Sequence, residues 1–161
     1  MIDTAKVERR ALRFAGVHEM RAEVERVHAW ARAGEARAAG NWSVGQIFGH
    51  LAFWIEEIDH DKGVRVAWYG RVLARLMKRR ILTGRPAAGV RLAGAPLGTY
   101  GCEEMTLAAG YERLVRAMAR LERGDFPSVD RNWGRMRPED WLNLHLRHAE
   151  LHLGFVFGPG A

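Results

Sequence analysis

Apolar residues recur at alternating intervals of four and three in four separate stretches of the chain. This spacing places them on one face of an α-helix, so it predicts four amphipathic helices. Helices with such stripes pack at small crossing angles, which is the geometry of a four-helix bundle. We therefore predict an all-α fold, and the 161 residues are about the length of one domain, residues 1–161. The predicted helices cover residues 18–33, 43–61, 103–123 and 138–157.

Residues at the ends of these stretches agree with the prediction. Ser43 is a suitable N-cap for the second helix, and Pro138 suits the first turn of the last helix. Glycines, which commonly end helices, lie where the second, third and fourth helices should stop, at Gly63, Gly124 and Gly158.

A long connection joins the second and third predicted helices. Its residues 84–101 are rich in Gly and Pro and should be irregular. Its residues 66–82 are helix-like, with bases on other faces, so we expect the apolar side to pack on the bundle and the bases to be solvated. That apolar side contains Tyr69, Val72, Leu73, Leu76 and Ile81.

The connection also holds the surplus positive charge. The chain has 25 Lys and Arg against 19 Asp and Glu, a net charge of +6. Residues 62–102 contain no acid and carry +9, whereas the remaining 120 residues carry −3. A basic balance often indicates a nucleic-acid partner, but one segment supplies the whole excess and no base-reading motif accompanies it, so nucleic acid is disfavoured. The nine bases are Lys62, Arg65, Arg71, Arg75, Lys78, Arg79, Arg80, Arg85 and Arg91.

Several classes of protein are excluded by what the sequence lacks. Cys102 is the single cysteine, so there is no intrachain disulfide and no Cys-rich zinc site. We expect the start of the third helix to lower the pKa of its thiol, although one cysteine without a spaced His is weak evidence for a nucleophile. Residues 1–10 have no apolar signal core, and the longest uncharged stretch, 38–55, is too polar to span a membrane. We therefore expect a cytoplasmic protein with no membrane span.

Histidines occupy the fourth helix where core residues are expected. His145, His148 and His152 follow Trp141 on the apolar stripe. An unpaired buried polar group costs about 1–3 kcal/mol, so three imidazoles would be a costly way to build a core. His148 and His152 are four residues apart, with Cβ atoms about 5–6 Å from each other on a helix. Both rings could therefore reach one metal ion.

His50 is a candidate third ligand, because it lies on the buried side of the second helix within an apolar run. A lone buried His is more often a satisfied core residue, and a His-x3-His pair also occurs on solvated helix faces. Three histidines on one predicted core stripe, together with a fourth within an apolar run, favour a metal site. Three His ligands with one open position are typical of catalytic zinc, and imidazole also suits Ni, Fe and Cu.

Other candidate groups carry less weight. Glu150 lies between His148 and His152, but two residues after the first His rather than directly after it, so the sequence is not H-E-x-x-H. Glu150 should point away from the metal, about 200° around the helix, and we expect it to be solvated. Zinc-peptidase chemistry is therefore disfavoured. We interpret the remaining histidines as partly exposed surface residues: His18, His28 and His60.

The motifs around the histidines resemble those of the DinB/YfiT-like metalloprotein superfamily, and most of all an uncharacterised branch of it. Residues 40–52 resemble the second-helix motif, and residues 141–153 resemble the last helix. Residues 9–14 and 78–80 add to the resemblance, which covers nearly the whole chain. One departure is at residues 130–134, where the branch usually has His-Pro-aromatic-aromatic-Gly and this chain has Asp-Arg-Asn-Trp-Gly.

The resemblance implies a four-helix bundle with a long connection between its second and third helices. It also implies a divalent metal, often Zn or Ni, held by the residues that match the motif, His50, His148 and His152. Characterised relatives include S-transferases that use bacillithiol, mycothiol or glutathione, and a maleylpyruvate isomerase. Dimers are common in the superfamily, so a homodimer is compatible with the resemblance.

We therefore predict a metal-dependent enzyme of the thiol S-transferase type acting on a small molecule. The metal would lower the pKa of water or of a low-molecular-weight thiol. His145 would transfer protons or support a ligand, or serve as a fourth ligand. The basic connection is interpreted as a pocket wall that favours an anionic substrate, and no motif identifies substrate-binding residues.

Two alternatives stay open. One is a stress-related metalloprotein whose site has lost turnover. The other is a module that binds an anionic surface, nucleic acid or membrane, through residues 62–102, where Trp68 and Tyr69 lie beside the bases.

Overall fold

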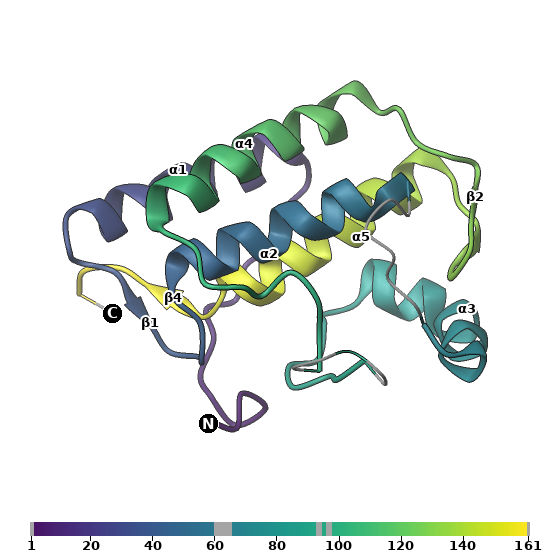
Figure 1. Cartoon of the computed structure of the whole chain (residues 1–161), viewed down its shortest axis with the longest axis horizontal. Coiled ribbons are helices and arrows are strands. Elements are labelled where there is room, and N and C mark those ends of the chain that lie inside the picture. The colour runs from purple at the N-terminus through teal and green to yellow at the C-terminus, as the bar shows by residue number, and fades with distance from the viewer. Residues whose placement is uncertain (1, 60–65, 93–94, 96–97, 161) are drawn as a thin grey trace.

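The computed structural model describes residues 2–59, 66–92, 95 and 98–160, and most of these residues are helical. Figure 1 shows α1, α2, α4 and α5 alongside one another, with α3 outside them. The predicted helical fold class is thus confirmed for the described part of the chain. The helices are α1 (Val17–Arg32), α2 (Val44–Glu56), α3 (Trp68–Thr83), α4 (Leu107–Arg123) and α5 (Pro138–Leu153), and a 3₁₀ turn (Glu57–Asp59) follows α2.

Two short antiparallel strand pairs tie the ends of the helices together. One pair joins the connection between α1 and α2 to the C-terminal end of the chain, and the other lies between α4 and α5. The backbone N–H of Arg10 also donates to the carbonyl of Gly154 at 2.8 Å, so the segment before α1 is fixed to the end of α5. The pairs are β1 (Arg37–Ala38) with β4 (Val156–Phe157), and β2 (Val129–Asp130) with β3 (Gly134–Arg135).

The predicted start of the second helix is confirmed in detail. The hydroxyl of Ser43 accepts from the backbone N–H of Gln46 at 3.2 Å, and the Gln46 side chain accepts from the N–H of Ser43 at 2.9 Å. This reciprocal capping box satisfies two backbone donors that the helix itself leaves free. Gly124 ends α4 as predicted. Gly63 lies outside the described residues.

Three helix boundaries differ from the prediction. The second helix ends at Glu56 rather than near residue 61, and its end tightens into the 3₁₀ turn Glu57–Asp59. The last helix ends at Leu153 rather than near residue 157, because Gly154 caps it and the chain then turns to pair β4 with β1. The third helix begins at Leu107 rather than at residue 103, because the Thr106 side chain accepts from the N–H of Ala109 at 3.3 Å and so caps the helix there.

Helices α2 and α4 approach so closely that only glycine fits between them. A Cβ added at Gly110 would lie 2.4 Å from the carbonyl oxygen of Gly45, and one added at Gly45 would lie 2.3 Å from that of Met105. The backbones of α2 and the start of α4 are therefore in direct contact on this side of α2. Fully or almost fully buried core side chains include Met20, Val24, Val27, Phe48, Leu51, Ile55, Leu114, Met118, Leu146 and Leu153.

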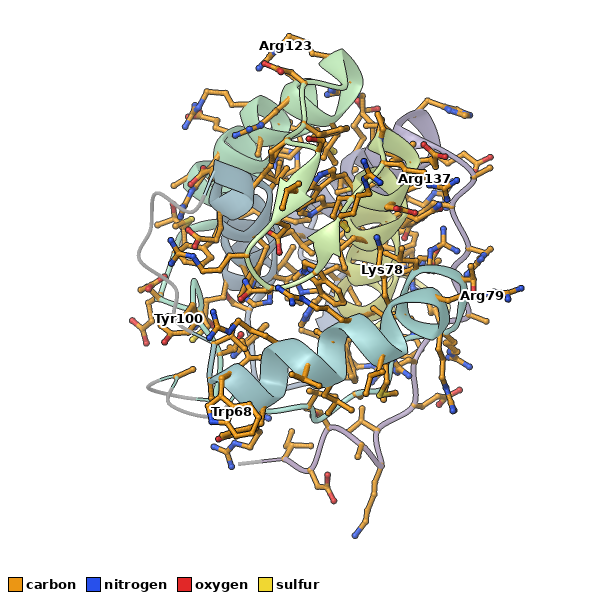
Figure 2. The ribbon with its side chains drawn as sticks, turned by 90° about the vertical axis from the view of Figure 1, so that its right-hand side faces the viewer. Trp68, Lys78, Arg79, Tyr100, Arg123 and Arg137 are labelled. Atoms are coloured by element: carbon orange, nitrogen blue, oxygen red, sulfur yellow. The ribbon has the colours of Figure 1, made fainter. Side chains whose placement is uncertain are left out.

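Helix α3 is oriented opposite to the expectation. Its apolar stripe was expected to pack on the other helices, yet Leu76 is 79% exposed. The helix is instead attached by its basic side: the ammonium of Lys78 lies 3.1 Å from the carboxylate of Asp140 on α5, and Arg75 donates to the carbonyl of Arg131 at 3.1 Å. Figure 2 shows Lys78 directed toward the other helices and Trp68 at the outer edge. The expectation that the bases are solvated is therefore wrong for Lys78.

Among the described residues, no helix combines the length and apolar character needed to cross a membrane.

Candidate metal centre

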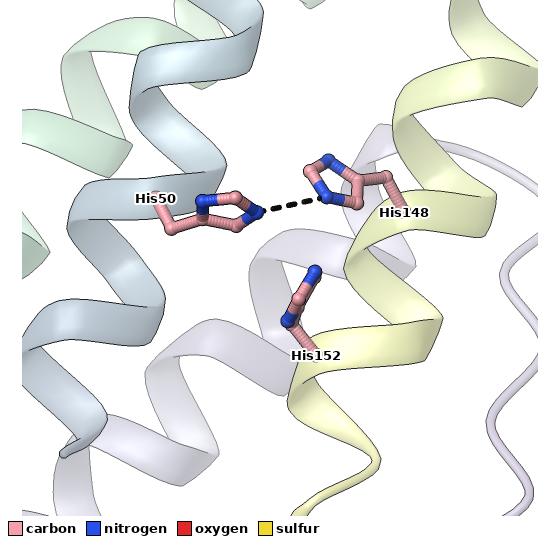
Figure 3. Close-up of side chains that lie close together, drawn as sticks. All are labelled: His50, His148 and His152. Carbon is pink, nitrogen blue, oxygen red and sulfur yellow. Dashed lines mark hydrogen bonds between the residues drawn. The ribbon is translucent and has the colours of Figure 1, made fainter. Parts of the chain in front are cut away.

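Three histidines from two helices meet on the side of α2 that faces α5. His50 comes from α2, and His148 and His152 come from successive turns of α5. One ring nitrogen from each lies within 4.8 Å of those of the other two (Figure 3). The helical spacing of four brings the two α5 rings together edge-on, with centroids 4.7 Å apart, and the packing of α2 against α5 supplies the third ring. The three residues predicted as metal ligands are thus brought together.

The tautomer of His50 follows from its hydrogen bonds. Its Nδ1 lies 2.9 Å from the backbone carbonyl oxygen of Tyr100. A carbonyl can only accept, so Nδ1 carries the proton and Nε2 presents a lone pair. That Nε2 lies 3.1 Å from Nε2 of His148, the contact drawn in Figure 3. A carbonyl that holds the far nitrogen is how proteins usually orient a metal-binding imidazole.

A glycine lets the connection reach His50. Gly101 follows Tyr100 with φ +69°, and a Cβ there would lie 2.4 Å from Cγ of Phe53 on α2. Both the backbone conformation and the close approach require glycine. The segment before α4 can therefore reach Nδ1 of His50.

All three imidazoles are held in the neutral form. Burial lowers the pKa of His50 to about 4, and the hydrogen bond to Tyr100 opposes that effect. Burial also lowers the pKa of His148 and His152 well below the ordinary value, and the mutual repulsion of the ring charges adds to it. Neutral imidazole is the form that binds metal ions, so the rings are ready for a cation at neutral pH.

Two tryptophans flank the histidines. Trp42 stacks on His152 with ring centroids 5.2 Å apart and also lies 4.7 Å from the ring of His50. Trp54, one helical turn after His50, meets the rings of His50 and His148 edge-on, each at 6.3 Å. The sequence interpretation did not single out either residue for the site. The signal available for Trp54 was its spacing of four from His50 on the same stripe.

The donor set fits a divalent transition metal. Zinc bonds of about 2.0–2.1 Å to two imidazoles in tetrahedral geometry place the nitrogens roughly 3.3–3.4 Å apart. The 3.1 Å between Nε2 of His50 and Nε2 of His148 is close to that value. The full group spreads to 4.8 Å, so small ring rotations would close it around an ion. Three imidazoles without a carboxylate suit a transition metal such as Zn, Ni, Cu or Fe rather than Mg or Ca.

His145 lies outside this group, although the sequence interpretation allowed it as a fourth ligand. Its ring stacks parallel to that of Trp141 at 6.3 Å, and its Nε2 is buried without a hydrogen-bond partner. Burial, aided by the charge of Arg120, lowers the pKa of His145 to about 3. The ring is therefore neutral and a weak base at physiological pH. Its role in proton transfer stays a prediction.

Glu150 is not solvated, so that expectation was wrong. Its carboxylate accepts from the N–H of Phe14 at 2.6 Å and pairs with Arg147 at 2.9 Å, and the side chains of this pair are only 4% and 2% exposed. Burial raises the pKa of Glu150. The carboxylate binds the segment that precedes α1 and is not among the three residues that could hold an ion.

The expected lowering of the Cys102 pKa is also wrong. Burial and the nearby charge of Glu103 raise the pKa of the thiol, because α4 begins only at Leu107 and its N-terminus does not act on Cys102. Reactive thiols need the opposite environment, so Cys102 has no feature of a nucleophile.

The other histidines and the departure at residue 130 have simple structural roles. His18 is exposed, and His28 stacks on Tyr111 at 3.8 Å. His60 lies outside the described residues. Asp130 is buried and accepts from the N–H groups of Asn132 and Trp133, each at 2.6 Å, so it organises the turn between β2 and β3.

Comparison with known proteins places the chain in one family. The matching family model is described as a protein of unknown function (DUF1569), and it covers residues 6–158. No curated protein and no solved structure matches the chain. Because the match spans nearly the whole sequence and both histidine-bearing helices, the chain belongs to this family of unknown function, DUF1569.

Proposed function

We propose that the protein is a divalent-metal-dependent enzyme, a four-helix bundle of the DinB-like type in which His50, His148 and His152 hold Zn or Ni. The observation that carries the proposal is the cluster of three neutral imidazoles in which the His50 tautomer is already set for ligation. Three protein ligands leave coordination open for an exogenous group, as in catalytic rather than structural zinc sites.

The reaction class we propose is transfer of a low-molecular-weight thiol to a small-molecule substrate. A bound ion supplies one thing, a lower pKa for a thiol or water, and so a nucleophile at neutral pH. The chain supplies the rest. The Tyr100 carbonyl holds the proton on Nδ1 of His50, and the rings of Trp42 and Trp54 pack against the ring of His50.

Positive charge close to the histidines favours an anionic substrate or a carboxylate-bearing thiol. Arg9 lies near enough to His152 to lower the pKa of that ring. Arg85, from the basic connection, donates to the backbone carbonyl of Arg9 at 3.5 Å. Burial lowers the pKa of the Arg9 guanidinium, and the charge of Arg85 adds to that effect. Lys78 is already paired with Asp140, so Arg9 and Arg85 are better candidates for contacts with an anionic group.

Metal analysis of purified protein tests the site. We expect wild type to retain a divalent metal through dialysis and His148→Ala to lose it, because the variant removes the ring that faces His50. His28→Ala is the matched control, since that ring stacks on Tyr111 instead. Equally little metal in wild type and His148→Ala would refute the proposal.

Turnover is tested separately on the metal-loaded protein. We expect thiol consumption with at least one electrophilic substrate, and its loss in His148→Ala. Retained metal without turnover of any thiol or hydrolytic substrate would instead identify a stress-related metalloprotein that has lost activity.

A further inference from the structure

Helix α3 presents a large apolar face to solvent. Six large side chains lie on one side of its successive turns, and their exposed fractions run from 37% for Met77 to 79% for Leu76. Single exposed hydrophobic residues are normal, but a contiguous apolar patch of this kind on a monomer marks an interaction site. The six residues, here called the α3 face, are Trp68, Tyr69, Val72, Leu73, Leu76 and Met77.

The α3 face is not needed to attach the helix. An ordinary surface helix buries its apolar stripe and exposes its charges. Here polar contacts attach the helix, namely Lys78 to the carboxylate of Asp140 and the carbonyl of Arg135, and Arg75 to the carbonyl of Arg131, while Leu82 in its last turn is the apolar residue that it buries. The helix is held by its basic side, so its apolar side is left for an external partner.

Exposed arginines follow the α3 face along the chain. Arg79 and Arg80 are exposed on the last turns of the helix, and Arg85 and Arg91 are exposed beyond it. No acid occurs anywhere in residues 62–102. Figure 2 shows Arg79 extending from one end of the helix and Trp68 lying at the other. The α3 face therefore combines an apolar surface with a local excess of positive charge.

We propose that the α3 face docks on an anionic lipid surface. Trp68 and Tyr69 have the amphipathic rings that prefer the headgroup level, and the aliphatic side chains would enter the boundary between headgroups and acyl chains. The exposed arginines would contact lipid phosphates. A cationic amphipathic helix lying in the plane of the interface binds in this way.

The charge and the apolar character together disfavour other partners. The phosphates of nucleic acid would attract the arginines but leave Leu73 and Leu76 without an apolar environment. A second copy would cover the leucines but bring together two segments that contain bases and no acid. An anionic lipid surface satisfies both halves of the α3 face.

Vesicle co-sedimentation of the full chain tests the proposal. The vesicles are pure phosphatidylcholine and an equimolar mixture with phosphatidylglycerol, each at low and high salt. Two double variants, Leu73→Ser/Leu76→Ser and Arg79→Gln/Arg80→Gln, remove the apolar and the cationic halves. The controls are Val129→Ser, which is 67% exposed on β2, and Arg116→Gln/Arg123→Gln on α4.

We expect wild type to bind the anionic vesicles, to bind the neutral ones far more weakly, and to be released by salt. The arginine variant should bind roughly 30-fold more weakly, from about 1 kcal/mol per base near the surface. The serine variant should bind at least about tenfold more weakly, because buried leucines dominate insertion. Both controls should bind like wild type. The changed side chains are exposed, so circular dichroism should show every variant folded.

Three results would overturn the proposal. One is no binding of wild type to anionic vesicles, or equal binding to neutral ones. A second is that wild type does not bind vesicles but binds DNA, and that the serine variant still binds DNA; this would identify nucleic acid as the partner. A third is that wild type does not bind vesicles and is a dimer in light scattering, whereas the serine variant is a monomer; this would identify a second copy of the chain as the partner.

Discussion

His145 should make the protein less stable in mild acid. Burial, followed by the charge of Arg120, lowers its pKa in the folded protein from 6.5 to about 3. In the unfolded chain the imidazole regains its ordinary pKa, so between these values the unfolded state binds more protons than the folded state. The stabilising contribution is therefore complete above about pH 6.5 and is lost progressively as the pH falls toward about 3.

The magnitude follows from the pKa difference, and the perturbation is His145→Leu. Each pH unit below the unfolded pKa costs about 1.4 kcal/mol, so lowering the pH from about 7 to about 5 should cost about 2 kcal/mol through this residue. Leucine binds no proton and leaves no buried unpaired nitrogen such as Nε2 of His145. The free energy of unfolding of the variant, relative to wild type, should therefore rise by about 2 kcal/mol between the two pH values.

Urea unfolding followed by circular dichroism measures this difference, with a chelator present so that metal binding does not enter. His18→Leu, the same exchange of residue type at a side chain that is 82% exposed, is the control. A difference for His145→Leu that is independent of pH, or that favours wild type in acid, would refute the reasoning.

Three further substitutions test the packing around the site. Gly110→Ala should lower the free energy of unfolding by about 1–3 kcal/mol in urea, because the added Cβ would lie 2.4 Å from the carbonyl of Gly45; an unchanged midpoint would contradict the close approach. Arg147→Met should cost about 3–5 kcal/mol by leaving Glu150 buried without its nearest cation. That loss should shrink at low pH, where Glu150 is protonated; a loss that is constant with pH would count against the ion pair. Lys78→Met should speed hydrogen exchange in α3 and leave α2 and α5 unchanged, because it removes an inward contact of α3.

The features that depend on local spacing could be predicted from the sequence. The four apolar stripes correspond to helices because periodicity alone decides which residues share a face. The interval of four between His148 and His152 likewise places their rings together on any helix. His50 could be predicted as their partner because the apolar run around it indicates which side of its helix is buried, and that side faces α5.

The features that depend on distant partners could not be predicted in this way. The direction of α3 is set by Lys78 and Asp140, which lie on different helices, and no stripe records which side of a helix has a polar partner elsewhere. Glu150 is buried because the backbone of Phe14 supplies a donor from before α1. The end of the last helix was ambiguous because Gly154 and Gly158 both suit a cap, and the pairing of β1 with β4 decided between them.

The hydrogen bond that sets the tautomer of His50 comes from a backbone carbonyl, so no side chain at position 100 is needed to make it. The side chain at position 100 can therefore be changed without altering which nitrogen faces His148. The sterically constrained position is the next one. Gly101 has a positive φ and lies so close to Phe53 that any Cβ would push the connection away from α2. The orientation of His50 thus depends on Gly101, a residue that is not itself a candidate metal ligand. A family member with a larger residue at this position should lose the hydrogen bond that orients the histidine.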